Sequence, residues 1–399
     1  MRPIPILLVL QALATAVRGQ QPVTRQQAVE AALARGPRVV LARSDTAAAL
    51  AMLRSARAFE NPVLSASYTK DPPQQHLALE LPLDLPWQRS ARVRAAAEAN
   101  TSAGYRFDRE RAATRFEAET AYTRALAADT HRRLSLRTAL DADSLLRMAR
   151  TRRDAGEASD LDVELAVVNA GQLANAAADD SVAAIEAVLD LQQVMGLPSD
   201  RALISLADSL QPPAFPSGPA DSVTLAVAAA AASLRSAQAA LALERRSVFG
   251  VPALQFGFDA HDPGGQRGLL PVIGIVLPLP LFNAHGGAIA LAAAERDRAQ
   301  AELDLARRES DADLARARRD LGLAAAKVRR DSTLVASARR VEAMALLAYG
   351  EGAVALPSVL EAARSAREAQ ARYVDDLAAA NAADAALRFL SAGTSRSSP

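Results

Sequence analysis

The sequence has 399 residues, of which 50% are hydrophobic and only 4% aromatic. Its 46 basic and 45 acidic residues alternate along helical segments, which argues against a nucleic-acid-binding protein. Cysteine is absent, so we expect no disulfide framework, no thiolate metal site and no lipid anchor on cysteine. Alanine dominates the apolar residues, and the composition therefore favours long helices that pack closely.

The N-terminal residues 1–19 have the pattern of a secretory signal peptide. Arg2 precedes an apolar run over residues 4–13, and small residues follow at Ala14 and Gly19. We therefore expect an exported protein whose mature chain begins near residue 20. No later run of eighteen or more apolar residues is present, so any part that enters a membrane is expected to do so as strands.

The first half of the mature chain, residues 20–195, changes its hydrophobic period along its length. A helical pattern broken at Gly36 is followed by two alternating segments, and the second of these carries leucine at every other position. Two proline-free helical segments come next, and Ser159 with Asp162 has the spacing of a capping box. The predicted elements are two initial helices, strands over about 62–69 and 76–85, and long helices over about 89–153 and 159–194.

A proline-rich segment, residues 196–220, is interpreted as an irregular linker between the halves. The second half, residues 221–390, then repeats the order of the first, and residues 391–399 are expected to be a disordered tail. A glycine-rich segment at residues 261–268 lacks the lysine and hydroxyl of a phosphate loop and is interpreted as a hairpin loop. The predicted elements are a helix over about 221–246, strands over about 252–260 and 269–281, and helices over about 286–349 and 356–390.

The two halves indicate an internal duplication. Pro82 and Pro278, at the ends of the predicted strands, lie 196 residues apart, and so do the helix-breaking residues Gly156 and Gly352. Equal spacing at both ends of a helix of about 70 residues points to one repeated unit. Each unit supplies two strands, so the chain has four.

Four strands are too few to close a barrel in a membrane, where the smallest common barrel has about eight strands and an open edge is not tolerated. The strands of several copies would have to be pooled, and three copies would give twelve. The predicted strands carry apolar residues on one face and polar residues on the other. This pattern suits a barrel with lipid outside and water inside.

Three stretches, taken with the duplication and the two glycine breaks, resemble the TolC-type outer-membrane efflux protein family. They are Ala28–Pro37, Phe59–Leu64 and Leu277–Asn283, and the resemblance extends over about residues 27–390. It implies a mainly α-helical protein with a small β part, in which three copies form a twelve-stranded β-barrel in the outer membrane and an α-barrel of long helices in the periplasm.

The resemblance also implies function. Members of the family are homotrimers that dock to a periplasmic adaptor protein and an inner-membrane pump, in tripartite efflux or type I secretion, and conduct substrates without catalysis or a cofactor. The chain would be exported by its signal peptide and contact outer-membrane lipid. The proline-framed junction and the absence of a lipid-anchor cysteine are most similar to the metal and cation efflux branch.

In the family, the turns at the glycine breaks form the periplasmic tip, where the tunnel narrows and the adaptor docks. A plain helix hairpin turn would also account for these glycines. The residues that match the tip by motif are Gly156, Glu157, Ser159, Gly350, Gly352 and Val354.

Family gates place carboxylates and a tyrosine close to these turns, and Asp162, Tyr349 and Glu361 occupy the matching positions. Three copies of a carboxylate around a pore would attract cations. Helix capping would equally explain Asp162, and a solvated charge in the first helical turn would explain Glu361. Val354 and Ser358 stand where the best-known gate has an arginine and an acid, which leaves room for a looser closure.

A barrel-to-tunnel junction is expected where the second strand of each half gives way to a long helix. Prolines would end the sheet pairing because they lack an amide donor, and a pair of glycines in the second half would free the backbone to turn. The two junctions are therefore expected to differ in stiffness. Their residues are Pro82 and Pro86 in the first half, and Pro278, Pro280, Gly286 and Gly287 in the second.

Two other classes of protein remain open. An exported coiled-coil adaptor or structural protein without a pore would explain the long helices but not the symmetrically placed strands. An exported enzyme would need a nucleophile or a metal motif. The four histidines, His76, His131, His261 and His285, lack a paired ligand at metal spacing, so no metal site is expected.

Overall fold

The computed structural model describes residues 21–71, 73–214, 223–260 and 269–393. The predicted signal peptide, the glycine-rich segment and most of the predicted tail therefore lie outside the described residues. The chain forms two compact units, and its two longest helices contribute residues to both. The unit that we call the tip unit holds residues 1–36, 115–215 and 321–385, and the sheet unit holds residues 37–114, 216–320 and 386–399.

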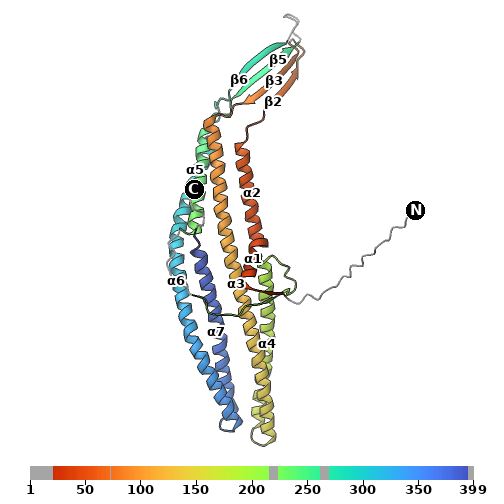
Figure 1. The fold of residues 1–399 in the computed structure, drawn as a ribbon, viewed down its shortest axis with the longest axis vertical. Helices are drawn as coiled ribbons and strands as arrows, with labels where there is room; N and C mark the ends of the chain where they lie inside the picture. The colour runs from red at the N-terminus through yellow and green to blue at the C-terminus, as the bar shows by residue number, and fades with distance from the viewer. Residues whose placement is uncertain (1–20, 72, 215–222, 261–268, 394–399) are drawn as a thin grey trace, which may run out of the picture. The chain divides into compact units, whose positions relative to one another are not determined.

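Long helices dominate the fold, as the composition predicts (Figure 1). The two longest, α3 and α6, contain 69 and 65 residues and stand at equivalent places in the two halves of the sequence. The helices are α1 (Arg25–Arg35), α2 (Pro37–Arg57), α3 (Pro86–Asp154), α4 (Asp160–Val194), α5 (Leu225–Arg246), α6 (Gly286–Gly350) and α7 (Leu356–Leu390).

One helix of the described residues, α5, is long and apolar enough to cross a membrane by length and composition. Much of its apolar character comes from alanine. Its Leu234 packs in a core cluster with Ala299 and Leu303 of α6. Part of the apolar side of this helix thus packs within the sheet unit.

The sheet unit carries a four-stranded antiparallel sheet in the order β2-β3-β5-β6 (Figure 1). Its strands are β2 (Val63–Tyr68), β3 (Gln75–Pro82), β5 (Ala253–Ala260) and β6 (Leu270–Val276). The four predicted strands are therefore present, although β6 ends at Val276 instead of near residue 281. Pro278 and Pro280 follow its last paired residue, in agreement with their lack of an amide donor. The outer edges of β2 and β6 have no strand partner in the described chain.

The tip unit contains a second, smaller sheet that the sequence analysis missed. β1 (Gln21–Val23) pairs in parallel with β4 (Ile204–Leu206), which lies inside the segment interpreted as an irregular linker. The expectation of an irregular linker is therefore wrong at β4. Three-residue strands are too short to show a hydrophobic period, so local sequence gives no sign of them.

Two buried polar side chains attach this small sheet to the helices of the tip unit. The Tyr122 hydroxyl of α3 donates to the Val23 carbonyl at 2.7 Å, and burial, followed by the neighbouring Asp208, raises the pKa of Tyr122 to about 12. Gln192 of α4 donates from Nε2 to the Pro198 carbonyl and accepts from the Leu203 amide. The start of the linker is thus ordered by side chains of the helices that precede it.

Candidate functional site

The two faces of the four-stranded sheet differ in polarity over β2, β3 and β5. The register places Leu79 of β3 beside Phe256 of β5, and Phe256 beside Ile273 of β6. Alternate residues of every strand share this face, because side chains point to opposite sides along a strand. The exposed large side chains of this apolar face are Leu64, Tyr68, Leu77, Leu79, Leu81, Phe256, Phe258, Ile273 and Ile275.

The opposite face, which we call the polar face, carries hydroxyl, amide and charged groups on β2, β3 and β5, whereas β6 presents Leu270, Val272 and Val276 there. Glu80 pairs across the strands with Gln255, and His76 with Asp259. His76 Nδ1 lies 2.8 Å from Asp259 Oδ1, and its Nε2 lies 3.3 Å from Thr69 Oγ1. These groups form a cross-strand network near one end of the sheet. No group of three or more potential metal ligands occurs in the described part of the chain.

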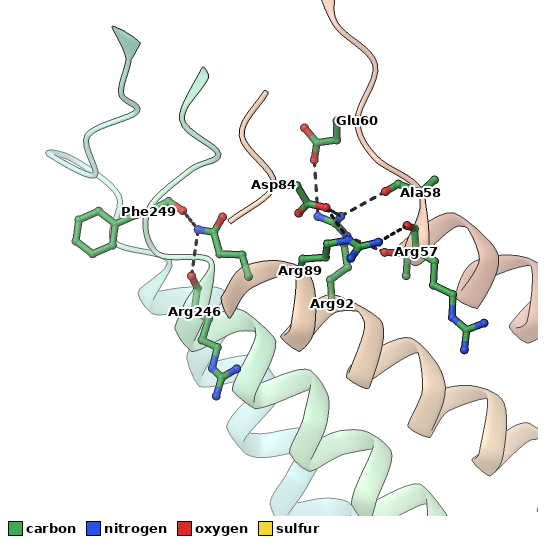
Figure 2. Close-up of polar contacts among 10 residues, drawn as sticks. Arg57, Ala58, Glu60, Asp84, Arg89, Arg92, Arg246 and Phe249 are labelled. Atoms are coloured by element: carbon green, nitrogen blue, oxygen red, sulfur yellow. Dashed lines mark hydrogen bonds and ion pairs between the residues drawn. The ribbon is translucent and has the colours of Figure 1, made fainter. Parts of the chain in front are cut away.

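The sheet joins the helices through a cluster of ion pairs (Figure 2). Asp84, in the segment between β3 and α3, forms an ion pair with Arg89 at 3.1 Å and accepts a hydrogen bond from Arg92 at 3.0 Å. The same arginines donate to terminal carbonyls of α2, Arg89 to that of Arg57 and Arg92 to that of Ala56. Because the last carbonyls of a helix have no intrahelical partner, α3 caps α2 at this junction.

Gln88, the residue before Arg89, caps the C-terminal end of α5 in the same way. Gln88, which is buried, donates from Nε2 to the carbonyls of Phe249 at 2.7 Å and Arg246 at 3.4 Å (Figure 2). Consecutive residues of α3 therefore hold the C-terminal ends of α2 and α5. Both ends must lie at the level of the first turn of α3.

The predicted junction residues lie in different structural elements. Pro82 is the last residue of β3 and Pro86 is the first of α3. In the second half, the left-handed backbone conformation belongs to His285, with φ of 58°, whereas Gly286 and Gly287 begin α6 without a positive φ. That Gly286 and Gly287 free the backbone to turn into the helix stays a prediction. An Asn283 Oδ1 contact to the His285 amide at 2.9 Å stabilises the turn.

The two predicted tips in the tip unit are turns of one kind. Gly156 and Gly352 have φ of 79° and 76°, the left-handed region that favours glycine. In the first turn, the backbone amide of Glu157 donates to the Arg152 carbonyl at 2.8 Å. In the second turn, the backbone amide of Ala353 donates to the Ala348 carbonyl at 2.8 Å. These bonds are those of a Schellman motif, which ends a helix and satisfies its last carbonyls. The duplication is therefore preserved in the hydrogen bonds.

Arg152 links the two turns within the tip unit. Its guanidinium lies 4.7 Å from the centre of the Tyr349 ring, and its Nη1 donates to the Tyr349 carbonyl. Tyr349 is buried among apolar residues of both hairpins, including Leu145 and Val359. Burial raises the pKa of Tyr349, and the Asp162 carboxylate adds to this, against the opposing effect of Arg152. The sequence around Arg152 gives no sign of this role, because it depends on a residue 197 positions away.

The three predicted gate residues are not brought together as a single contact. Asp162 accepts from the Ser159 amide and hydroxyl, while Ser159 Oγ accepts from the Asp162 amide, so the predicted capping box is present. Glu361 is exposed on α7. Of the predicted tip residues, Glu157 lies 3.5 Å from Arg152, and Val354 packs against the cluster that contains Tyr349.

A cleft of about 480 Å³ lies farther along the same helices of the tip unit. Its floor is apolar, with Leu145 and Val359 among the lining residues, and its rim carries Arg137, Arg339 and Glu342. Burial raises the pKa of Glu342, with Asp141 adding to the effect and the arginines opposing it. The cleft therefore combines an apolar base with charges of both signs.

A pair of carboxylates faces each other between α6 and α7. Asp331 is only 3% exposed, and its Oδ2 has no hydrogen-bond partner among the described residues. Burial raises the pKa of Asp376, and the hydrogen bond and charge of Asp331 raise it further, while Lys327 and Arg330 oppose the shift. A proton on Asp376, shared in a hydrogen bond to Asp331, would supply the missing donor.

This pair predicts that the tip unit loses stability as the pH rises. Because the pKa of Asp376 is raised in the folded protein, its contribution to the free energy of unfolding is complete at a pH below the ordinary carboxyl pKa. This contribution is lost as the pH rises through the raised pKa. Asp331→Asn should therefore stabilise the unit at pH 8, by about 1 kcal/mol, and much less at pH 4. Urea unfolding at both pH values measures this, with the half-exposed Asp313→Asn as the control. An equal effect of Asp331→Asn at both pH values would contradict the shared proton.

Comparisons with known proteins place this fold. No protein-family model and no curated protein matches the sequence. The outer membrane protein VceC of Vibrio cholerae has a TM-score of 0.77 at 18% identity, over 92% of this chain and 96% of VceC. The CmeC outer membrane channel of Campylobacter jejuni has a TM-score of 0.76 at 14% identity, over 92% of this chain and 85% of CmeC.

The chain thus has the fold of TolC-type outer-membrane channels, and the predicted fold class, mainly α with four antiparallel strands, is confirmed. CusC, a protein that forms a transmembrane channel, has a TM-score of 0.74 at 17% identity, over 93% of this chain and 92% of CusC. Since this score is no higher than the other two, the comparison does not single out the metal and cation efflux branch.

Proposed function

We propose that this chain is one protomer of a trimeric outer-membrane efflux channel. The observation that carries the proposal is the sheet, because its apolar face is exposed while its polar face gathers the charged and amide groups. A soluble protein does not expose a continuous face of this kind without a partner. A bilayer outside the sheet and water inside it would satisfy both faces.

The edges of the sheet favour closure by other copies. β2 and β6 run in opposite directions at the two ends of the sheet, so the β6 edge of one copy can pair in antiparallel fashion with the β2 edge of the next. Three copies would close a barrel of twelve strands and leave no open edge. Glu80, Gln255 and Asp259 would then face the water-filled interior.

The helical part would continue the duct through the periplasm, with the turns at Gly156 and Gly352 at its end. The cleft rimmed by Arg137, Arg339 and Glu342 suits an amphipathic helix of a periplasmic adaptor, since its apolar base can take an apolar ridge and its rim can take charges. An inner-membrane pump would supply the substrate. A poreless adaptor would not need the exposed apolar face of the sheet.

Planar-bilayer recordings test the proposal together with its predicted gate. The wild-type protein, purified from outer membranes, should give cation-selective channels. Asp162→Ala with Glu361→Ala should raise the conductance and lower the cation selectivity, because a ring of carboxylates is removed from each protomer. Since Asp162 also caps α4, Ser159→Ala is the matched control for the loss of the cap, which costs about 1 kcal/mol. A protein that is soluble and monomeric would overturn the channel function, and unchanged conductance and selectivity would remove both carboxylates from the gate.

A further inference from the structure

Exposed aromatic side chains gather in one region of the sheet unit. Aromatic residues make up 4% of the sequence. Nevertheless, every aromatic residue among the exposed large hydrophobic residues of the described chain belongs to the sheet, to the segments that join it to the helices, or to the first turn of α3. These residues are Phe59, Tyr68, Trp87, Phe249, Phe256, Phe258 and Phe282.

Three of these rings lie around the first turn of α3. Arg89 lies over the Phe59 ring, 4.6 Å from its centre, while the neighbouring Gln88 holds the Phe249 carbonyl at 2.7 Å. Trp87 precedes both in the sequence. The three aromatic residues therefore share one level, where the strands end and the helices begin.

Phe282 belongs to the same region. In the sequence it lies between Pro278, which contacts the segment after α5, and His285, which contacts the end of α5. Pro278 packs so closely on Gly250 that a Cβ atom at that glycine would lie only 2.7 Å from the Pro278 side chain. His285 Nδ1 lies 3.9 Å from Glu244. The Phe282 side chain between these contacts is fully exposed. We call Phe59, Trp87, Phe249 and Phe282 the aromatic belt.

Arginines with exposed side chains stand next to the aromatic belt. Arg57 is the last residue of α2, and Arg245 and Arg246 are the last residues of α5. Arg246 Nη1 lies 3.4 Å from the Trp87 carbonyl. In Figure 2 the guanidinium groups of Arg57 and Arg246 point away from the ion pairs around Asp84.

The nearby acidic groups already have partners. Asp84 forms ion pairs with Arg89 and Arg92, Glu60 lies 3.9 Å from Arg92, and Glu244 lies 3.9 Å from His285. The charge presented outward at this level is therefore positive. Helix C-termini favour arginine in any setting, but they do not require a belt of exposed aromatic rings beside it.

We propose that this region binds phospholipid: the aromatic belt lies at the interface of the membrane leaflet that faces the periplasm, and Arg57, Arg245 and Arg246 bind lipid phosphate groups. Aromatic side chains favour the level of the lipid headgroups. Arginine matches phosphate because its planar guanidinium can donate two parallel hydrogen bonds. This inference rests on the proposed channel function, and it specifies the depth at which the sheet unit sits in the bilayer.

The depth is testable because Trp87 is the only tryptophan. The full chain is reconstituted in phosphatidylethanolamine and phosphatidylglycerol vesicles that contain lipids with a nitroxide at the headgroup or deep in the acyl chain. Trp87 fluorescence should be quenched several-fold more by the headgroup nitroxide than by the deep one. In the variant Trp87→Phe with Ile273→Trp, the tryptophan lies on the apolar face, and the deep nitroxide should quench it more strongly.

The two tryptophan positions separate this inference from the channel function. If deep quenching is seen at position 273 while Trp87 is quenched only by aqueous iodide, the sheet is inserted but the belt is not at the interface, and this inference is overturned. If neither position is quenched by lipid, the membrane-channel function itself falls. Stronger quenching of Trp87 by the deep nitroxide would also overturn the interfacial placement.

The arginines are tested by counting bound lipid. Native mass spectrometry of the protein from the same vesicles should show several-fold less retained phosphatidylglycerol for the triple variant Arg57→Gln, Arg245→Gln, Arg246→Gln than for the wild type. The matched control replaces Arg316, Arg318 and Arg319, exposed on α6, by glutamine. Equal retention by the triple variant and the wild type, or an equal loss in the control, would contradict a phosphate site at the belt.

Discussion

Replacing Phe256 by arginine is expected to prevent insertion of the protein into the membrane. Phe256 is exposed at the centre of the apolar face, where it pairs with Leu79 on one side and Ile273 on the other. An arginine on the lipid face of a barrel strand costs about 2–4 kcal/mol near the middle of the bilayer. A trimer would carry this cost three times, so the folded protein in the membrane fraction should fall at least tenfold.

The adjacent Gln255 provides the matched control, because it lies on the polar face of the same strand. Gln255→Arg should insert as well as the wild type, since its side chain would point into water. Insertion is measured as the protein that stays with outer membranes after a urea wash. If both variants insert equally well, the apolar face does not contact lipid.

Removal of Arg152 is expected to loosen the contact between the two helix turns, and so to favour opening of the proposed channel. The Arg152 side chain is only 15% exposed, stacks on Tyr349 and donates to its carbonyl, and so joins the ends of α3 and α6. A hydrogen bond from a charged group contributes about 1.5–3 kcal/mol. In Arg152→Ala the ratio of open to closed channels in planar bilayers should therefore rise about tenfold or more.

Arg153 is the control for this change because it is next in sequence but differs in its contacts. Its side chain is 43% exposed and pairs with Asp154 and Asp160 of its own turn. Exposed pairs of this kind contribute little, so Arg153→Ala should leave the conductance near the wild-type value. An Arg152→Ala channel that opens no more often than the Arg153→Ala channel would remove Arg152 from the closure.

The sequence was sufficient for features that depend on local periodicity. Alternating leucines predicted β3, long proline-free stretches predicted α3 and α6, and the Ser159 and Asp162 spacing predicted a capping box that is present. The 196-residue repeat predicted that the two turns would be alike, and they share the same hydrogen bonds. Such patterns are visible in sequence because each residue is constrained by neighbours one helical turn or two strand positions away.

Features that join distant segments could not be predicted in this way. The Arg152 contact to Tyr349 and the Asp331 contact to Asp376 depend on how separate helices pack, and nothing in their own sequence windows distinguishes them from surface charges. The parallel pair β1 and β4 is too short to carry a period. At the second junction, the positive φ belongs to His285, and nothing in the sequence around it indicates this conformation.

Closure of the sheet by neighbouring copies is the central claim, and cysteine crosslinking measures it directly in a chain without native cysteine. Ser65→Cys on β2 is combined in turn with Leu270→Cys, Val272→Cys or Gly274→Cys on β6, all on the polar face. Within one copy these strands are three strand spacings apart, about 14 Å, too far for a disulfide. The account predicts, for at least one pair, covalent dimers and trimers and nothing larger. Monomers alone with every pair, or a ladder that continues beyond trimers, would contradict it.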